Sequence, residues 1–167
     1  MRKQSPDAID LLDADHLSVH ALLQSWHELV RTHASPLQRR ALAEAICLEL
    51  TLHAKIEEEL FHPAMREALR DPQLAEHADE LDARQRECIA RILCTSPEDA
   101  QHEAHMALLA ECFERHVRTQ REQVFNRALA ARIDLQSLGR AITARREELR
   151  AAPDALRDDA IGFARVS

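Results

Sequence analysis

Residues 50–65 read LTLHAKIEEELFHPAM, and this stretch decides the fold class. It belongs to a segment, residues 36–69, whose apolar side chains recur every three or four residues, which is the period of one face of an α-helix. His53 lies on that face, and Glu57 follows it by about one helical turn. Pro63 is expected to kink the helix or end its main part, because proline lacks the N–H that an interior position needs. The stretch therefore predicts a long, interrupted helix with His53 turned towards the core.

Helix-start signals organise the rest of the chain. Three Ser-Pro pairs each offer a capping hydroxyl followed by a proline suited to the first helical position: Ser5-Pro6, Ser35-Pro36 and Ser96-Pro97. With the matching stop signals, they predict helices over residues 6–33, 36–69, 73–94, 97–131 and 135–151. Connections of only a few residues favour antiparallel neighbours. We therefore predict an all-α fold, an up-down-up-down antiparallel four-helix bundle with an additional C-terminal helix, which forms one domain over residues 1–151 and leaves a tail at 152–167.

The composition agrees with this fold class and narrows the function. Two glycines and no tyrosines occur among the 167 residues, which favours helices over strands. The net charge is −7 with both signs mixed along the chain, and this disfavours nucleic-acid binding. No stretch is apolar for long enough to span a membrane, and the first residues lack the apolar core of a signal peptide. We expect a cytoplasmic protein that binds neither nucleic acid nor a membrane.

Histidine is the unusual feature, with ten copies in the chain. Three of them, His16, His53 and His116, fall on the apolar stripes of three different predicted helices. A buried imidazole without a hydrogen-bond partner costs roughly 1–3 kcal/mol, so three that converge need a common partner. A metal ion accepts a lone pair from each, and Glu57 can neutralise part of its charge. A single inward histidine is more often a satisfied core residue, but three on three helices favour a metal site.

The other histidines carry weaker signals. His20 follows His16 by one turn and lies either at the edge of the same cavity or on the flank of its helix. His77 belongs to the predicted helix 73–94. The remaining five are expected at the surface, at helix ends or on outward faces: His27, His33, His62, His102 and His105.

Three stretches resemble the hemerythrin-like (HHE cation-binding) domain family: LLDADHLSVHALL at 11–23, LTLHAKIEEELFHPAM at 50–65 and ERHVRTQREQVF at 114–125. IDLQSLGRAITARREEL at 133–149 is similar to the extra helix that follows the domain in one bacterial branch. The resemblance implies a helical bundle that holds non-haem iron. It places ligands at His16, His53, Glu57 and His116, with Glu57 as the carboxylate that bridges two irons.

Two positions depart from the family pattern. Four residues after His116, where the family has a carboxylate, the chain has Gln120, which is neutral and a poor ligand. On the third helix the register of the pattern favours Asp82 as the ligand, whereas residue chemistry favours His77. These two lie about 140° apart around a helix, so both cannot face the site equally. The resemblance thus implies one or two iron ions, and these two departures predict an incomplete di-iron site.

The resemblance implies that the iron binds or senses dioxygen, nitric oxide or peroxide, or that the protein handles iron. The sequence singles out no proton-transfer groups beyond the ligands, so binding fits better than turnover, although an enzyme stays open. An exposed C-terminal helix offers a contact for a homodimer. The alternative is a degenerate, metal-free bundle that acts as an interaction or regulatory module, for which Asp82 and Gln120 are the evidence.

Overall fold

The computed structural model describes residues 5–162, which are mostly helical and contain no strand. The all-α prediction is confirmed. The elements follow in this order: α1 (Ala8–Arg31), α2 (Pro36–Ile56), η1 (Glu57–Phe61), α3 (His62–Leu69), α4 (Pro72–Cys94), α5 (Ala100–Thr119), η2 (Gln120–Phe125), α6 (Asn126–Ala130), α7 (Leu135–Arg150) and α8 (Pro153–Gly162). Among the described residues, no helix combines the length and apolar character needed to cross a membrane.

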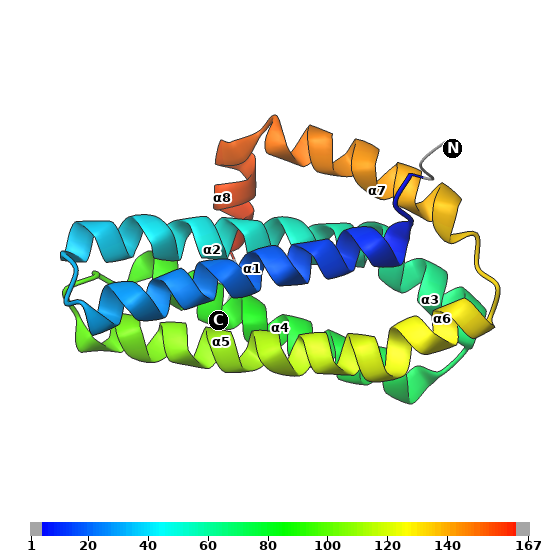
Figure 1. The fold of residues 1–167 in the computed structure, drawn as a ribbon, viewed down its shortest axis with the longest axis horizontal. Helices are drawn as coiled ribbons and strands as arrows, with labels where there is room; N and C mark the ends of the chain where they lie inside the picture. The colour runs from blue at the N-terminus through cyan, green and yellow to red at the C-terminus, as the bar shows by residue number, and fades with distance from the viewer. Residues whose placement is uncertain (1–4, 163–167) are drawn as a thin grey trace.

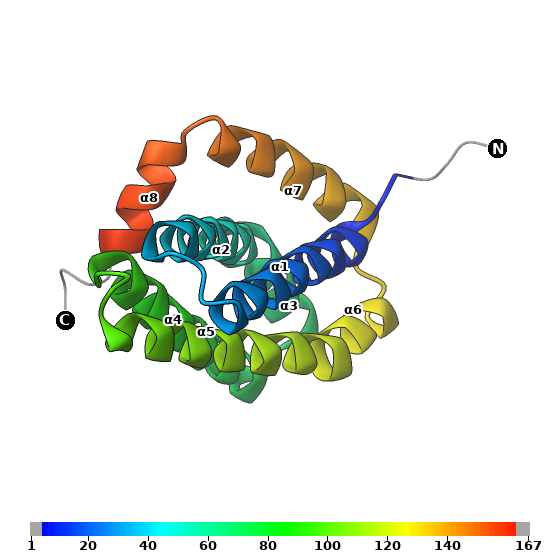
Figure 2. The same ribbon diagram turned by 60° about the vertical axis from the view of Figure 1, so that its left-hand side comes forward.

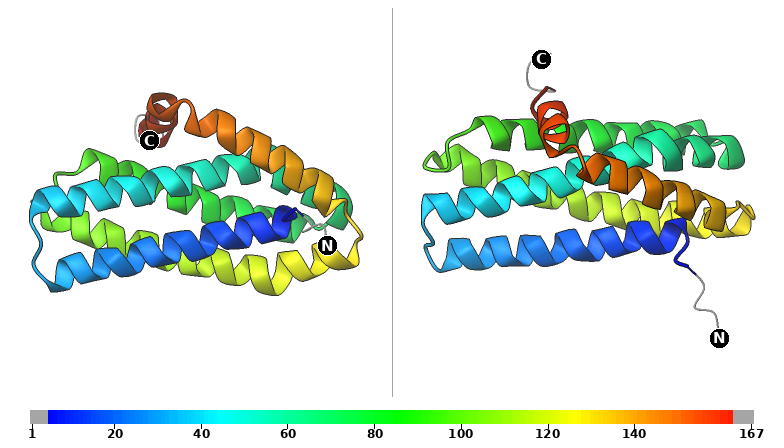
Figure 3. Two further views of the ribbon diagram at one scale, coloured as in Figure 1. Left: turned by 45° about the horizontal axis from the view of Figure 1, so that its top comes forward. Right: turned by 90° about the horizontal axis from the view of Figure 1, so that it is seen from above.

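Four long helices, α1, α2, α4 and α5, lie side by side along the long axis of the molecule (Figures 1 and 3). Two apolar clusters fill the space between them. Along α1, Leu12 belongs to the first cluster and Val19 to the second, and the buried His16 lies between them. On α5 the buried His116 follows Phe113 of the second cluster. The polar residues that the sequence singled out therefore interrupt the apolar core where its two halves meet.

Only one of the three Ser-Pro pairs starts a helix. Ser35 caps α2 as predicted, and its side chain accepts a hydrogen bond from the N–H of Gln38. The prediction was wrong at the other two pairs, because an aspartate a few residues later takes the capping position. Asp7 caps α1 and Asp99 caps α5, and each accepts backbone hydrogen bonds from the first turn. Both helices consequently begin two to three residues after the predicted start.

The predicted interruption by Pro63 takes the form of a π-helical turn, η1, between α2 and α3. A π-helical turn closes its hydrogen bonds over five residues instead of four. Here the N–H of His62 donates to the carbonyl oxygen of Glu57, five residues earlier. Pro63 has no N–H to donate and its ring crowds the carbonyl one turn before, so the wider turn relieves an obstacle to regular helix. A second π-helical turn, η2, which the sequence did not signal, follows Thr119.

The C-terminal helices wrap around the outside of the long helices (Figure 2). The helix predicted at residues 135–151 is present as α7 and packs against α1 and α2. Gly139 allows this approach, because a Cβ at that position would lie 2.9 Å from the backbone carbon of Asp7. Where the sequence predicted a tail, α8 instead packs against α2 and α4 by burying Leu156 and Ala160, one turn apart. Residues 163–167 of the predicted tail lie outside the described residues.

Candidate metal centre

Four buried side chains from four elements meet between the two apolar clusters. His16 comes from α1, His53 from α2, Glu57 from η1 and His116 from α5, and each is at most 6% exposed. Each residue offers one ligand atom, and these four atoms all lie within 4.8 Å of one another. Three imidazoles and one carboxylate at this separation form a group that could hold a metal ion.

Glu57 lies at the middle of the group. Its Oε1 is 3.4 Å from Nε2 of His53, and its Oε2 is 3.4 Å from Nε2 of His116. The two Nε2 atoms are themselves 3.4 Å apart. Two donors that each lie about 2.0–2.1 Å from one ion can be no more than roughly 4.2 Å apart, so all three separations suit a shared ion.

Unpartnered polar atoms support a metal at this place. Within the described residues, neither ring nitrogen of His16 has a hydrogen-bond partner, although the side chain is only 2% exposed. Oε2 of Glu57 is also buried without a hydrogen bond among those residues. Buried polar groups in native proteins are nearly always satisfied, and each exception needs an explanation such as an ion. The donor set of imidazole and carboxylate fits a first-row transition metal.

The electrostatics leave the lone pairs of His16 and His116 free for a metal, whereas His53 has to release a proton to bind one. Burial lowers the pKa of His16 to about 3 and that of His116 to about 4, so both imidazoles are neutral at physiological pH. Burial also opposes a charge on His53, but Glu57 and Asp15 outweigh it and raise the pKa of His53 to about 10. Burial opposes the carboxylate of Glu57 as well, yet the adjacent His53 holds its pKa well below the usual range.

Asp15 orients His53 from outside the group. Its Oδ2 lies 3.2 Å from Nδ1 of His53 and accepts a hydrogen bond of 2.6 Å from Arg146 on α7. A carboxylate on the outer nitrogen of a ligand histidine fixes the ring so that the other nitrogen faces the metal. The C-terminal helix α7 is therefore linked to the centre by two hydrogen bonds, one between Arg146 and Asp15 and one between Asp15 and His53.

We expect Asp15→Ala to weaken metal binding by about 10–100-fold, which is the usual cost of removing the partner of a ligand histidine. Competition with a chromophoric chelator measures the dissociation constant. Asp154→Ala, at an exposed aspartate of α8, is the matched control. Equal affinities of the two variants would contradict the orienting role of Asp15.

The structure separates the candidates on which the sequence was undecided. Asp82 is buried, and its Oδ1 lies 3.9 Å from Nδ1 of His116, whereas His77 is half-exposed. Gln120 is buried and its amide donates a hydrogen bond to Oε1 of Glu57. His20 lies at the surface, where its Nδ1 is 3.1 Å from Oε1 of Glu114. Asp82 and Gln120 thus adjoin the four-residue group, and His20 lies apart from it.

Two of the five histidines expected at the surface are in fact buried. His102 packs its ring against Trp26, with the ring centroids 5.8 Å apart. His62 lies 3.9 Å from Oε2 of Glu57 and 3.5 Å from Oδ2 of Asp82. The sequence pattern placed His62 at a helix end or on an outward face, and in a regular helix a residue five positions after Glu57 would indeed lie on a different face. Pro63 was the available signal, because an interrupted helix changes which residues share a face.

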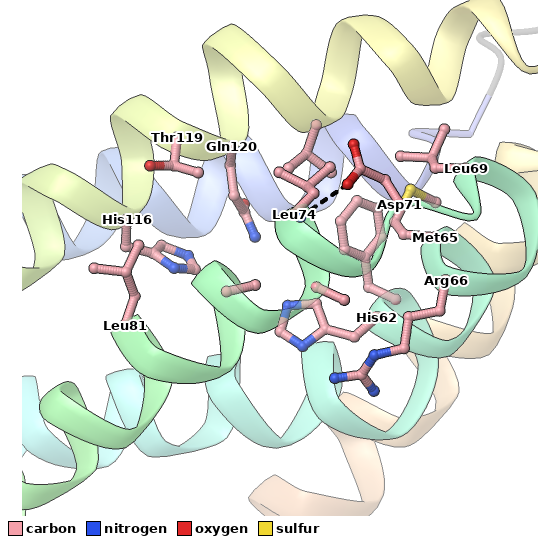
Figure 4. Close-up of a pocket in the computed structure, with 14 residues that line it drawn as sticks. His62, Met65, Arg66, Leu69, Asp71, Leu74, Leu81, His116, Thr119 and Gln120 are labelled. Carbon is pink, nitrogen blue, oxygen red and sulfur yellow. Dashed lines mark hydrogen bonds between the residues drawn. The ribbon is translucent and has the colours of Figure 1, made fainter.

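A pocket leads from the surface to one side of this group (Figure 4). Its buried end is formed by His62, His116 and Gln120, and Arg66 lies at its more exposed end. The rest of the wall is mostly apolar: Phe61, Met65, Leu69, Leu74, Leu81 and Val124. The cavity has a volume of about 40 Å³. This is space for a few small molecules and not for a bulky substrate.

Comparisons with known proteins agree with this geometry. A model of the hemerythrin HHE cation binding domain family matches residues 7–128. The fold is similar to the crystal structure of a hemerythrin HHE cation binding domain-containing protein from Mycobacterium kansasii, with a TM-score of 0.78 and 21% identity over 95% of this chain and 99% of that chain. No curated protein sequence matches the chain. The family match contains the whole histidine group, while Arg146 on α7 lies beyond it.

Proposed function

Since this chain belongs to the hemerythrin HHE cation-binding domain family, we propose that it holds non-haem iron with His16, His53, Glu57 and His116 and binds or senses dioxygen, nitric oxide or peroxide. The observation that carries the proposal is the pair of buried, unpartnered nitrogens of His16, set among three further donor side chains. Family membership favours iron over manganese or zinc, which the same donors also suit. When bound, iron supplies a redox-active Lewis acid to which a small ligand can attach.

The surrounding side chains suit binding better than turnover. The apolar clusters on both sides exclude bulk water from the group, which protects a reactive metal from side reactions. Gln120 ends in an amide at the inner end of the pocket, and one of its hydrogens is donated to Glu57. The narrow, mostly apolar wall favours a small ligand with little charge over a larger polar substrate.

We also propose that α1, α2, α4 and α5 form an up-down-up-down antiparallel bundle. The connections 32–35 and 95–99 are short, and successive long helices α1 and α2, α2 and α4, and α4 and α5 pack against each other. Short links between packed helices favour antiparallel neighbours. In such a bundle the ligands from α1, α2 and α5 lie at the same height, as a shared ion requires.

The pocket gives a direct test of ligand access. Leu74 lines it at the start of α4, and we expect Leu74→Trp to slow the association of nitric oxide with the ferrous protein by at least about tenfold, because a larger ring must move before the ligand passes. Stopped-flow absorbance measures the rate, and elemental analysis checks that the iron content is unchanged. Leu108→Trp, at a leucine of α5 that is 50% exposed, is the control. Equal rates in both variants would exclude this pocket as the route.

One observation favours a second function, that of a metal-free interaction module. The hydrogen bond from Gln120 partly satisfies Glu57 without any ion, as a site that has lost its metal would require. This function predicts that anaerobic reconstitution with ferrous iron adds no bound metal and no thermal stability. It leaves both nitrogens of the buried His16 unexplained, and we therefore rank it second.

A further inference from the structure

Three arginines of α7 pair with acidic residues on the elements that carry His16, His53 and Glu57. The pairs are Arg145 with Glu59 of η1, Arg146 with Asp15 of α1, and Arg150 with Glu49 of α2. Ion pairs in contact with solvent contribute little, because water and salt screen them. The side chains of Arg146 and Asp15 are only 14% and 17% exposed, against 56% and 41% for Arg150 and Glu49. Of the three pairs, that of Arg146 and Asp15 is therefore screened least.

One oxygen of Asp15 joins Arg146 to a metal ligand. Oδ2 of Asp15 accepts a hydrogen bond of 2.6 Å from Nη2 of Arg146 and lies 3.2 Å from Nδ1 of His53. The other ring nitrogen of His53, Nε2, faces Glu57 and His116, each at 3.4 Å. Because Asp15 is partly exposed, its carboxylate can turn towards water when nothing holds it. The hydrogen bond from Arg146 opposes this rotation and keeps Oδ2 against His53.

The burial of Arg146 is poorly explained by stability. Taking a charged pair out of water costs free energy, and the attraction between the charges often does no more than offset that cost. Nε of Arg146 is also buried without a hydrogen-bond partner among the described residues, which adds to the cost. The close approach of α7 to α1 at Gly139, two turns before Arg146, brings the guanidinium within reach of Asp15. What Arg146 positions explains its burial better than what it stabilises.

We propose that Arg146 is a positioning residue of the metal centre, which holds Asp15 against His53 and thereby makes α7 part of the centre. The inference rests on the proposed function, because His53 is one of the ligands assigned there. Helix α7 supplies none of the four ligands and lies beyond residues 7–128, which match the family model. The metal affinity of this chain therefore depends on a helix outside the matched segment.

A double-mutant cycle on the full chain tests whether Arg146 acts through Asp15. We expect Arg146→Gln to weaken the binding of ferrous iron by about tenfold, the lower end of the usual range for losing the partner of a ligand histidine, because Asp15 remains but is no longer held. In an Asp15→Ala background the same change should have no further effect, since the two residues act on His53 through one hydrogen-bonded chain. Arg150→Gln, in the exposed pair one turn further along α7, is the matched control and should bind iron as the natural chain does.

Two results of the cycle would overturn the positioning role. One is unchanged affinity in Arg146→Gln, and the other is a further tenfold loss when Arg146→Gln is added to Asp15→Ala, which would mean that Arg146 acts on the fold in general. If Arg146→Gln does not fold, as judged by circular dichroism, Arg146→Met takes its place, because it keeps the apolar stem of the side chain without the charge.

Nitrogen-15 NMR of His53 gives a readout that needs no metal. The Nδ1 proton of a histidine that donates it to a buried carboxylate exchanges slowly with water and gives a resolved signal, which His53→Gln assigns. We expect this signal in the natural chain and in Arg150→Gln, and its loss in Arg146→Gln and in Asp15→Ala. Iron in the natural chain together with a retained signal in Arg146→Gln would overturn this inference alone. No iron in any variant would overturn the proposed function.

Discussion

Glu57→Gln is expected to bind metal more weakly than the natural chain by well over about 100-fold. Removing even the outer partner of a ligand histidine costs roughly 10–100-fold, and Glu57 is the one carboxylate among the four central donors. It is fully buried, so bulk solvent does not compensate for the loss of its charge. Glutamine has nearly the same shape and can still accept the hydrogen bond from Gln120, so the loss should reflect the charge and not the packing.

The measurement is the dissociation constant for ferrous iron, with the thermal midpoint recorded before and after metal addition. A ligand that binds only the folded state raises stability in proportion to the logarithm of its concentration over its dissociation constant. The natural chain should therefore gain thermal stability from metal, and the variant should not. Glu58→Gln changes the adjacent, solvent-exposed glutamate, which pairs with Arg86, and should behave as the natural chain. Tight metal binding by Glu57→Gln would show that Glu57 is not a metal ligand.

Phe113→Ala is expected to lower the free energy of unfolding by about 3–5 kcal/mol, the range measured for large aromatic residues truncated in a protein core. Phe113 is 2% exposed on α5 and belongs to the second apolar cluster. Its ring also lies 6.1 Å from the ring of His16, in an edge-on arrangement, and so forms part of the wall that positions that ligand. Truncating Phe113 to alanine removes buried apolar surface and also leaves a cavity beside the four ligand residues, and both effects lower the free energy of unfolding.

Urea denaturation of the metal-free protein measures this loss. Leu108→Ala, at a half-exposed leucine on the same helix, is the matched control and should cost less than about 0.5 kcal/mol. A loss below about 1 kcal/mol in Phe113→Ala would mean that the core near His16 is looser than the described packing. Such a result would also mean that Phe113 does little to hold His16 in position before metal binds.

Local sequence patterns predicted the helices and the inward histidines well because those features depend on neighbours within one or two turns. His16, His53 and His116 share apolar stripes, and the structure buries all three. Helix starts were less predictable, since Ser96 and Asp99 are competing caps three residues apart. Ser96 instead accepts a hydrogen bond from Glu98 in the turn, and Asp99 caps α5.

The larger errors of the sequence-based prediction concern features that the spacing of apolar residues along one helix does not determine. His62 was expected at a helix end or on an outward face, and the wider turn of η1 instead directs it towards Glu57. The choice between Asp82 and His77 needed the packing of α4 against its neighbours, which spacing alone does not fix. The helix α8 has only two buried apolar residues in ten, and its position depends on distant partners such as Lys55, which contacts Asp159 at 2.6 Å.

The most direct test of the central claim is the metal content of the chain, purified without added metal or chelator, compared with that of His53→Ala. His53 is buried and its Nε2 lies 3.4 Å from both Glu57 and His116, so its loss should empty the centre. We predict iron in the natural chain and none above background in the variant. Absence of metal from the natural chain, even after anaerobic loading with ferrous iron, would contradict a metal centre and favour the interaction module.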